Sequence, residues 1–398
     1  MDISKIRLDS PVCANYAYFD TAAASAATQK NIDAVTEYLQ RTAEAGLYLP
    51  SFRKETYARI EQVREQAAAF INAKPEEIAF IKNATEGLCF IAQGMAWQPG
   101  DEVIIPDFEN LSNLVPWLRL EQTRGIKVIK VPAQDSGKVA VADIEAVITE
   151  RTRLISFSHL PNATGAIQDA KAICAMARKH GVQTLICAAQ SLGMIPTDVR
   201  EIDCDYLAAC GRKALRAIEG TGILYVRQSL IGSLEPCLVG WWNSSFDFKT
   251  QQLSLAETAR RFEAGCPNVP AILSLGEAVA YAQELGIEAI FERVRALGNF
   301  ALERLQRLPG FELYGPQDAA GRIGIIPFNI KGVNAQALVR KMEERNIIIE
   351  AGHFMAHTIM NRYQITEMLR LSLHYFNSEQ EIEDAIAVIR DTMQLQEK

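Results

Sequence analysis

The sequence contains no apolar run that approaches the roughly 18 residues of a membrane span. Its amino terminus lacks a basic stretch followed by an apolar one, so no secretory signal is evident. With a net charge of -7 and no cluster of basic residues, the chain offers no positive face to nucleic-acid phosphates. The 8 cysteines show no closely spaced pairs, and so long a chain needs no disulfide staples. We therefore expect a soluble cytoplasmic protein without membrane or nucleic-acid partners.

Hydrophobic residues make up 48% of the 398 residues, enough to bury a large core in two or three domains. In the first part of the chain, short apolar strands alternate with amphipathic helical stretches, as in a parallel α/β sheet. The expected strands are residues 77–81, 102–106, 127–131, 153–157, 182–187 and 206–210, and the expected early helices are residues 32–45 and 52–71.

Beyond about Asn268 this alternation stops. One long helical region is expected at residues 271–308, then short strands near 324–330 and 347–350, and a closing helix at 379–394. We predict an α/β protein in three parts. A segment at residues 1–20 packs with the small domain, a large domain covers residues 21–268, and a smaller α+β domain covers residues 269–398.

Chemically reactive side chains follow two of the expected strands at their carboxyl ends. Cys187 ends one strand and precedes Gln190, while Cys210 ends the next and precedes Lys213. Ligands of an open α/β sheet collect outside the carboxyl ends of its strands, so these side chains should face one crevice. A desolvated lysine has a lowered pKa and an amine free to form a Schiff base. Taken alone, however, a lysine is more often a solvated surface residue.

Thr85 follows the expected strand 77–81 and stands where the N-cap of a helix would be. A capped helix N-terminus is a ready anion site, which suits a cofactor phosphate. The commoner role of such a threonine is an ordinary helix cap.

Several segments carry the motifs of one enzyme family, in that family's order. Residues 109–117 match Glu-His-His-x-Asn-x-x-Pro-Trp, residues 261–268 match Arg-Phe-Glu-x-Gly-Thr-Pro-Asn, and residues 370–377 match Arg-x-Ser-x-His-x-Tyr-Asn. Further matches lie at residues 18–24, 83–87, 158–165 and 182–227. Over nearly its whole length the sequence resembles the class V aminotransferase and cysteine desulfurase-like family. Members of that family are fold-type I enzymes that use pyridoxal 5'-phosphate (PLP).

The resemblance implies roles for individual residues. Lys213 matches the lysine that bonds covalently to PLP, and Thr85 matches a phosphate contact. Asn162 and Gln190 match groups that bond the 3'-oxygen of the pyridine ring. Arg370 matches the arginine that holds the substrate carboxylate, a task suited to a bidentate guanidinium.

The family also implies a fold-type I large domain with a mainly parallel sheet, an amino-acid substrate and a homodimer whose active sites are shared between subunits. Within such a site, Ala23 and Asn162 would lie at the substrate together with Arg370.

At several positions that the resemblance places against the cofactor, this chain departs from the family pattern. The departures are Asn110 for the stacking histidine, Cys187 for the aspartate that pairs with the pyridinium nitrogen, Cys210 for the phosphate-binding serine or threonine, Arg212 for the histidine beside the lysine, and Cys266 for the threonine that reaches the neighbouring subunit's phosphate. A neutral thiol at Cys187 would leave PLP a weaker electron sink, whereas a thiolate would partly restore the pairing. The weaker sink favours β-elimination, β-replacement or racemisation over transamination.

The C-terminal loop departs from the family pattern as well. Met355 stands where desulfurases carry their nucleophilic cysteine, and a thioether cannot attack the sulfur of a substrate. A conventional cysteine desulfurase is therefore not expected. Glu350 replaces a cation and would repel a second carboxylate. His353 and His357 could act as acid or base or could be satisfied loop residues.

Two readings remain. The preferred one is a PLP-dependent enzyme acting on an amino acid, most simply a carbon–sulfur or related β-lyase or an epimerase-like relative. The alternative is a PLP-type fold that binds an iron–sulfur cluster or soft metal, with a redox or sulfur-transfer role. The ligands in that alternative would be Cys89, Cys187, Cys210 and, from the partner subunit, Cys266. Trp242 fits an active-site wall or a hydrophobic interface equally well.

Overall fold

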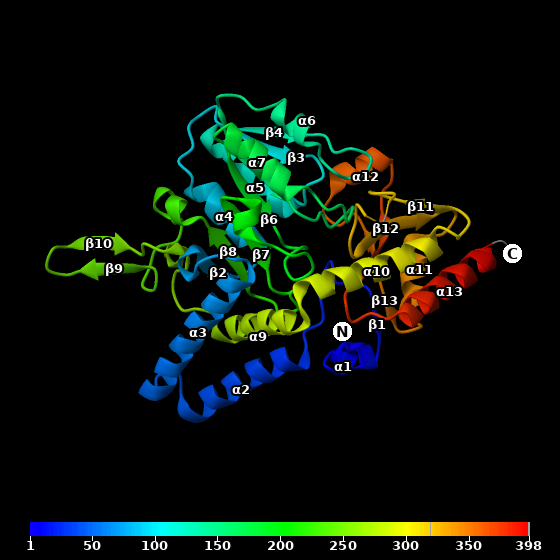
Figure 1. Ribbon diagram of the computed structural model, residues 1–398, viewed down its shortest axis with the longest axis horizontal. Coiled ribbons are helices and arrows are strands. Elements are labelled where there is room, and N and C mark those ends of the chain that lie inside the picture. The colour runs from blue at the N-terminus through cyan, green and yellow to red at the C-terminus, as the bar shows by residue number, and fades with distance from the viewer. Residues whose placement is uncertain (319, 397–398) are drawn as a thin grey trace.

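The computed structural model describes residues 1–318 and 320–396, and it confirms the α/β class (Figure 1). The described residues form a seven-stranded central sheet in the order β2-β8-β7-β6-β5-β3-β4. Its strands are β2 (Ile78–Ile81), β8 (Gly222–Val226), β7 (Tyr206–Cys210), β6 (Gln183–Cys187), β5 (Thr152–Ser158), β3 (Glu102–Pro106) and β4 (Lys127–Val131). The strands from β7 to β4 pair in parallel, whereas β8 is antiparallel to β7 and to β2. The sheet is therefore mixed but mostly parallel.

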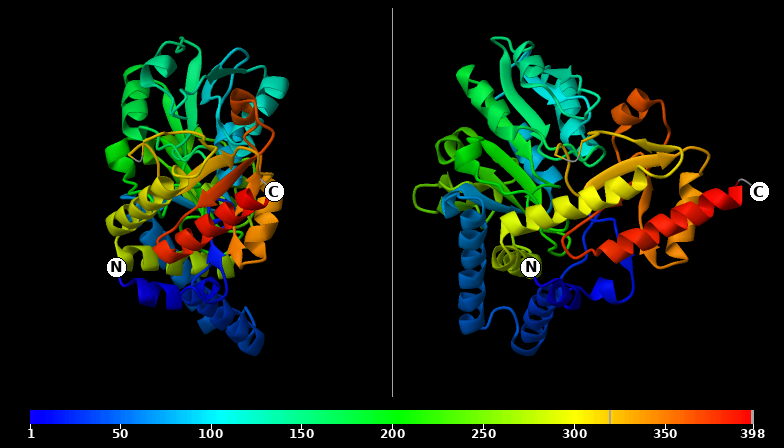
Figure 2. Two further views of the ribbon diagram at one scale, coloured as in Figure 1. Left: turned by 90° about the vertical axis from the view of Figure 1, so that its right-hand side faces the viewer. Right: turned by 45° about the vertical axis from the view of Figure 1, so that its right-hand side comes forward.

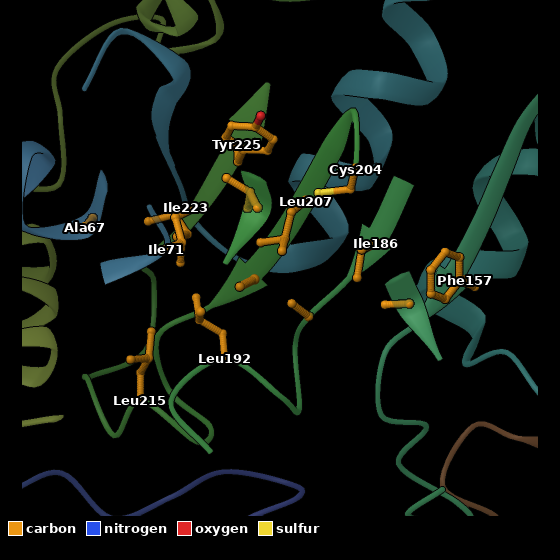
Figure 3. Packing of buried hydrophobic residues seen from close by; sticks show 14 of the residues in the cluster. Ala67, Ile71, Phe157, Ile186, Leu192, Cys204, Leu207, Leu215, Ile223 and Tyr225 are labelled. Carbon is orange, nitrogen blue, oxygen red and sulfur yellow. The ribbon is translucent and has the colours of Figure 1, made fainter. Parts of the chain in front are cut away.

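The sheet is covered on both faces, which explains its nearly continuous apolar strands. On one face, Phe157, Ile186, Leu207 and Ile223 come from four neighbouring strands and share a core cluster (Figure 3). This cluster includes residues of α3 (Pro50–Phe70), α7 (Ala170–Lys179) and α9 (Val269–Leu285). The opposite face packs against α4 (Ala84–Gly94) and α5 (Leu111–Arg124).

The helical region expected at residues 271–308 is present, and it consists of two helices rather than one stretch. Two helices, α9 and α10 (Ile287–Leu305), are separated by Gly286, whose φ of 80° lies in the left-handed region that ends a helix. Helix α9 packs against α3 and against α2 (Gln29–Ala45) in the core of the large unit. Helix α9 thus shares a core with the large sheet although it lies beyond residue 268, and the boundary expected there stays a prediction.

The smaller unit holds a second sheet in the order β11-β12-β15-β14. Its strands are β11 (Phe311–Leu313), β12 (Ile325–Ile330), β15 (Met368–Ser372) and β14 (Glu350–Gly352). Helices α10 and α13 (Glu379–Gln396) lie side by side across it and share its core (Figure 2). The N-terminal strand β1 (Ala17–Tyr18) pairs in parallel with β13 (Ile347–Ile348). That pairing ties the first residues to the small unit.

Several elements were not expected from the sequence. A hairpin of β9 (Ser244–Asp247) and β10 (Gln252–Leu255) projects from the large unit (Figure 1). The remaining helices are α1 (Ile3–Leu8), α6 (Val141–Glu145), α8 (Val199–Ile202), α11 (Ala335–Glu343) and α12 (His357–Tyr363). Within the described ranges, no helix combines the length and the apolar character needed to cross a bilayer.

Candidate active site

A cavity of about 110 Å³ opens where β6 and β7 end and where α4 and α5 begin. Both strands end in a cysteine, and both helices direct their N-termini toward the same space, so polar groups from distant segments converge there. The lining residues are Asn83, Ala84, Thr85, Asn110, Ser112, Asn113, Ser158, Leu160, Asn162, Cys187, Ala189, Gln190, Cys210, Arg212 and Lys213. The cofactor residues expected on this chain thus meet in one place, whereas Cys266, assigned to the partner's site, lies elsewhere.

Lys213 lies in this cavity just beyond β7 and is half-buried. Burial lowers its pKa, and the charges of Arg212 and Arg370 lower it further. Among the described residues, none accepts a hydrogen bond from its amine. The turn that carries it is tight at Gly211, where an added Cβ would lie 2.8 Å from the side chain of Thr221. A lowered pKa favours the neutral amine, which is the form that can attack an aldehyde.

The N-termini of α4 and α5 both contribute residues to the lining of the cavity. The cap of α4 is Asn83, whose side chain accepts a hydrogen bond from the Glu86 amide at 3.0 Å, so the expected cap at Thr85 is wrong. Thr85 lies in the first turn instead, and its hydroxyl donates to Ser112 Oγ at 2.9 Å. Asn110 caps α5 by accepting from the Ser112 amide. Converging helix ends and hydroxyls suit a phosphate. Ser112 was missed because only the folded chain brings it beside Thr85.

The C-terminal loop reaches the edge of the cavity. The side-chain amides of Asn110 and Asn162 both donate to the carbonyl of Phe354, at 3.2 and 2.9 Å. Phe354 and Met355 have φ angles of 49° and 58°, an uncommon left-handed pair without glycine. Met355 is 50% exposed, so the position of the family nucleophile is accessible even though it carries a thioether.

A buried acid lies behind Cys187. Burial and, to a lesser degree, the nearby Glu109 raise the pKa of the Cys187 thiol to about 11, so the group is a neutral thiol at pH 7. Glu109 accepts hydrogen bonds from the Ser158 amide and hydroxyl, both at 2.6 Å. Burial nevertheless raises the pKa of Glu109 to about 7. The sequence identified Glu109 only as part of a motif, because its burial was not visible there.

Glu109 should make stability depend on pH. The pKa of its carboxyl is 4.5 in the unfolded chain and about 7 in the folded one. The protonated carboxyl therefore contributes fully to the free energy of unfolding below pH 4.5, and this contribution is lost as the pH rises through 7. Over that window we expect the free energy of unfolding of the wild type to fall by about 3 kcal/mol relative to Glu109→Gln. Urea titrations of both proteins at pH 5 and pH 8 measure the difference. An equal change in the free energy of unfolding of both proteins between pH 5 and pH 8 would contradict the raised pKa of Glu109.

The N-terminal segment closes one side of the site. Gln190 donates from Nε2 to the carbonyl of Ala22 at 2.8 Å, and Arg212 donates to the carbonyl of Ala23. The Ser25 amide donates in return to the Arg212 carbonyl at 2.8 Å. Ala23 is therefore fixed beside Arg212, although it is not part of the cavity lining.

A family model described as Aminotransferase class-V matches residues 17–384. The chain belongs to this family. A cysteine desulfurase of Serratia proteamaculans (strain 568) is 34% identical over 412 residues, covering 99% of this chain and 98% of that one. The apo cysteine desulfurase of Thermococcus onnurineus NA1 has a TM-score of 0.93 at 28% identity, covering 98% of both chains.

A second similar solved structure is that of the cystine C–S lyase C-DES in complex with its reaction product, cysteine persulfide. Its TM-score is 0.88 at 25% identity, and the match covers 96% of this chain and 99% of that one. A C-DES variant has also been solved with glycine covalently linked to its PLP cofactor.

Within one chain, the described residues bring together only two of the cysteines expected in the metal-binding alternative. Cys187 and Cys210 line the cavity, but Cys89 does not and lies near Cys237 instead. Cys266 lines a separate cavity of about 140 Å³. In residues 1–318 and 320–396, no group of three or more His, Cys, Asp or Glu side chains could hold a metal ion.

The histidines and the tryptophan that the sequence left open also lie outside the cavity lining. The rings of His353 and His357 lie 4.5 Å apart, and His353 Nδ1 accepts from the Met355 amide at 3.1 Å. Trp242 lines the same separate cavity as Cys266. Its ring packs edge-on against Tyr57 at 5.2 Å. The roles of His353, His357 and Trp242 stay open.

Proposed function

We propose that this class V chain is a PLP-dependent enzyme that acts on an amino acid. The observation that carries the proposal is Lys213, a desolvated amine within a cavity that also has an anion-binding end. PLP supplies an electron sink for bonds at the α-carbon of an amino acid. Its phosphate fits the Thr85 and Ser112 hydroxyls, the two helix N-termini and Arg212. The C-DES structures support this fit because that relative holds PLP.

Lys213 has two tasks in the proposal. Its amine holds the coenzyme between turnovers and then takes the α-proton of the bound amino acid as a general base. A pKa lowered by burial suits both tasks, because the neutral amine is the reactive form. Gln190 and Asn162 orient the ring oxygen, and Ala23, whose carbonyl accepts a hydrogen bond from Arg212, contacts the substrate.

The reaction branch is proposed from two residues. The neutral thiol of Cys187 leaves a weaker electron sink than an aspartate would, which suits β-elimination, β-replacement or epimerisation. Met355 cannot take over a sulfur atom as a thiolate can. We therefore favour a carbon–sulfur or related β-lyase, the activity named for C-DES, over a desulfurase that passes through an enzyme-bound persulfide.

One sample tests the function. Wild-type protein should show visible absorption from PLP and contain about one PLP per chain by chemical release, with iron, zinc and copper far below one atom per chain. Cys187→Ser should leave the visible absorption and the PLP content unchanged. A colourless protein that ignores added PLP contradicts the proposal, and stoichiometric iron lost in Cys187→Ser would support the metal alternative instead.

We also propose a homodimer, in which Cys266 faces the partner's site. Large apolar side chains are exposed beside and on the β9–β10 hairpin, among them Trp241 at 56% and Phe248 at 82% exposure. An exposed apolar group of this kind is typical of an interface.

The pair of substitutions Trp241→Glu and Phe248→Glu should convert the dimer to a monomer, because two charges would be buried without partners. Light scattering after size exclusion measures the mass. Leu8→Glu, at an 83% exposed position on α1, is the matched control and should stay dimeric. A monomeric wild type, or an unaffected dimer in the double variant, would contradict the interface.

A further inference from the structure

Arg370, the residue expected to hold the substrate carboxylate, is already bound to two carboxylates of its own chain. Its Nη2 donates to Asp20 Oδ1 at 3.0 Å and also to Glu350 Oε2. The side chain is 2% exposed, and the ring of Phe354 covers the guanidinium with its centroid 4.0 Å from Cζ. Before any amino acid binds, the charge of Arg370 is therefore already paired, and one face of its guanidinium is covered by Phe354.

The geometry of a guanidinium explains why these two carboxylates block a substrate carboxylate. A carboxylate binds it in two-pronged fashion along one of two edges, Nε with Nη2 or Nη1 with Nη2. Both edges use Nη2, and the described residues already take both of its hydrogens. Nε of Arg370 has no acceptor among the described residues, and Nη1 reaches only the Asn162 carbonyl at 3.5 Å. No complete fork is left for a substrate.

Glu350, rather than Asp20, is the group that can leave. The side chain of Glu350 is 42% exposed, whereas that of Asp20 is 16% exposed. Glu350 stands directly opposite Arg370 in the antiparallel pairing of β14 with β15, at the start of the segment that carries Phe354. Burial raises the pKa of Asp20 to about 6 in spite of Arg370, and the charge of Glu350 contributes to the rise. The two carboxylates thus crowd one cation.

We propose that Glu350 is a specificity-determining residue that competes internally with the substrate carboxylate for Arg370. This proposal rests on the proposed function, in which the ligand is an amino acid. A ligand carboxylate takes one edge of the guanidinium, and Glu350 moves to solvent. The cost of that displacement lowers the affinity for every ligand that binds through a carboxylate, and ligands without one are unaffected.

Titration calorimetry with L-alanine and ethylamine tests the proposal, because ethylamine is alanine without its carboxylate. For Glu350→Gln we expect L-alanine to bind at least about tenfold more tightly than it binds the wild type, with ethylamine unchanged. Glu350→Ala should shift in the same direction. Glu367→Gln is the matched control and should behave as wild type, since it removes one charge near the same strand from a carboxylate that accepts only from Gln336 in the described part of the chain.

The outcomes separate the two proposals. Unchanged or weaker L-alanine binding by folded Glu350→Gln overturns the role of Glu350, and so does an equal gain for ethylamine. Thermal unfolding verifies that each variant is folded. Calorimetry records binding with or without the coenzyme. If protein that lacks PLP still shows the tighter binding of L-alanine by Glu350→Gln, only the proposed function is refuted.

Discussion

Lys213→Ala is expected to lower turnover by at least about 1,000-fold, because one substitution removes both the covalent anchor and the general base. The substrate need not be known, since each proposed branch begins with loss of the α-proton. Exchange of the α-hydrogen of amino acids in D2O, followed by NMR, therefore measures the common step. The visible absorption of the bound coenzyme should shift in the same variant.

Lys82→Ala is the control for that experiment. Its side chain is 71% exposed and pairs with Glu86 outside the cavity lining. We expect exchange rates and absorption like those of the wild type. Substantial α-hydrogen exchange in Lys213→Ala, at rates near those of Lys82→Ala, would mean that another group takes the proton.

Arg370→Met is expected to destabilise the fold by about 3 to 5 kcal/mol at pH 7.5, because it leaves the largely buried carboxylate of Asp20 without its cation. The loss should be smaller at pH 5, since protonation of Asp20 removes the unpaired charge and its pKa is already raised to about 6 in the wild type. Urea unfolding at both pH values measures the effect.

A double variant separates charge from packing at this position. Adding Glu350→Gln to Arg370→Met should recover part of the lost stability at pH 7.5, because one of the two opposed charges is gone. Equal destabilisation at both pH values, with no recovery in the double variant, would show that Arg370 acts through packing against Phe354 rather than through its charge.

Much of the large sheet could be predicted from local sequence. The strands at residues 102–106, 127–131 and 206–210 agree with β3, β4 and β7 at both ends, because short apolar runs between turns are strong signals. The helical region expected at residues 271–308 did not include the interruption at Gly286, where a left-handed φ separates α9 from α10. The β9–β10 hairpin carries few buried side chains and left no periodic signal.

The candidate site, like the fold, could be predicted only in part. Cys187 and Lys213 could be placed together because they follow the carboxyl ends of two adjacent strands. Cys89 was expected among the ligands of the metal alternative, but it is not part of the cavity lining and lies near Cys237. The pairing of Glu350 with Arg370 could not be predicted, since it depends on the register between β14 and β15.

The most direct test of the account is to find where the coenzyme is attached. Reduction of PLP-loaded protein with borohydride, followed by peptide mass spectrometry, fixes any lysine-bound coenzyme in place. The account predicts a phosphopyridoxyl group on Lys213, near one per chain, that disappears when reduction is omitted. Attachment at a different lysine, or none at all in protein that retains PLP, would contradict it.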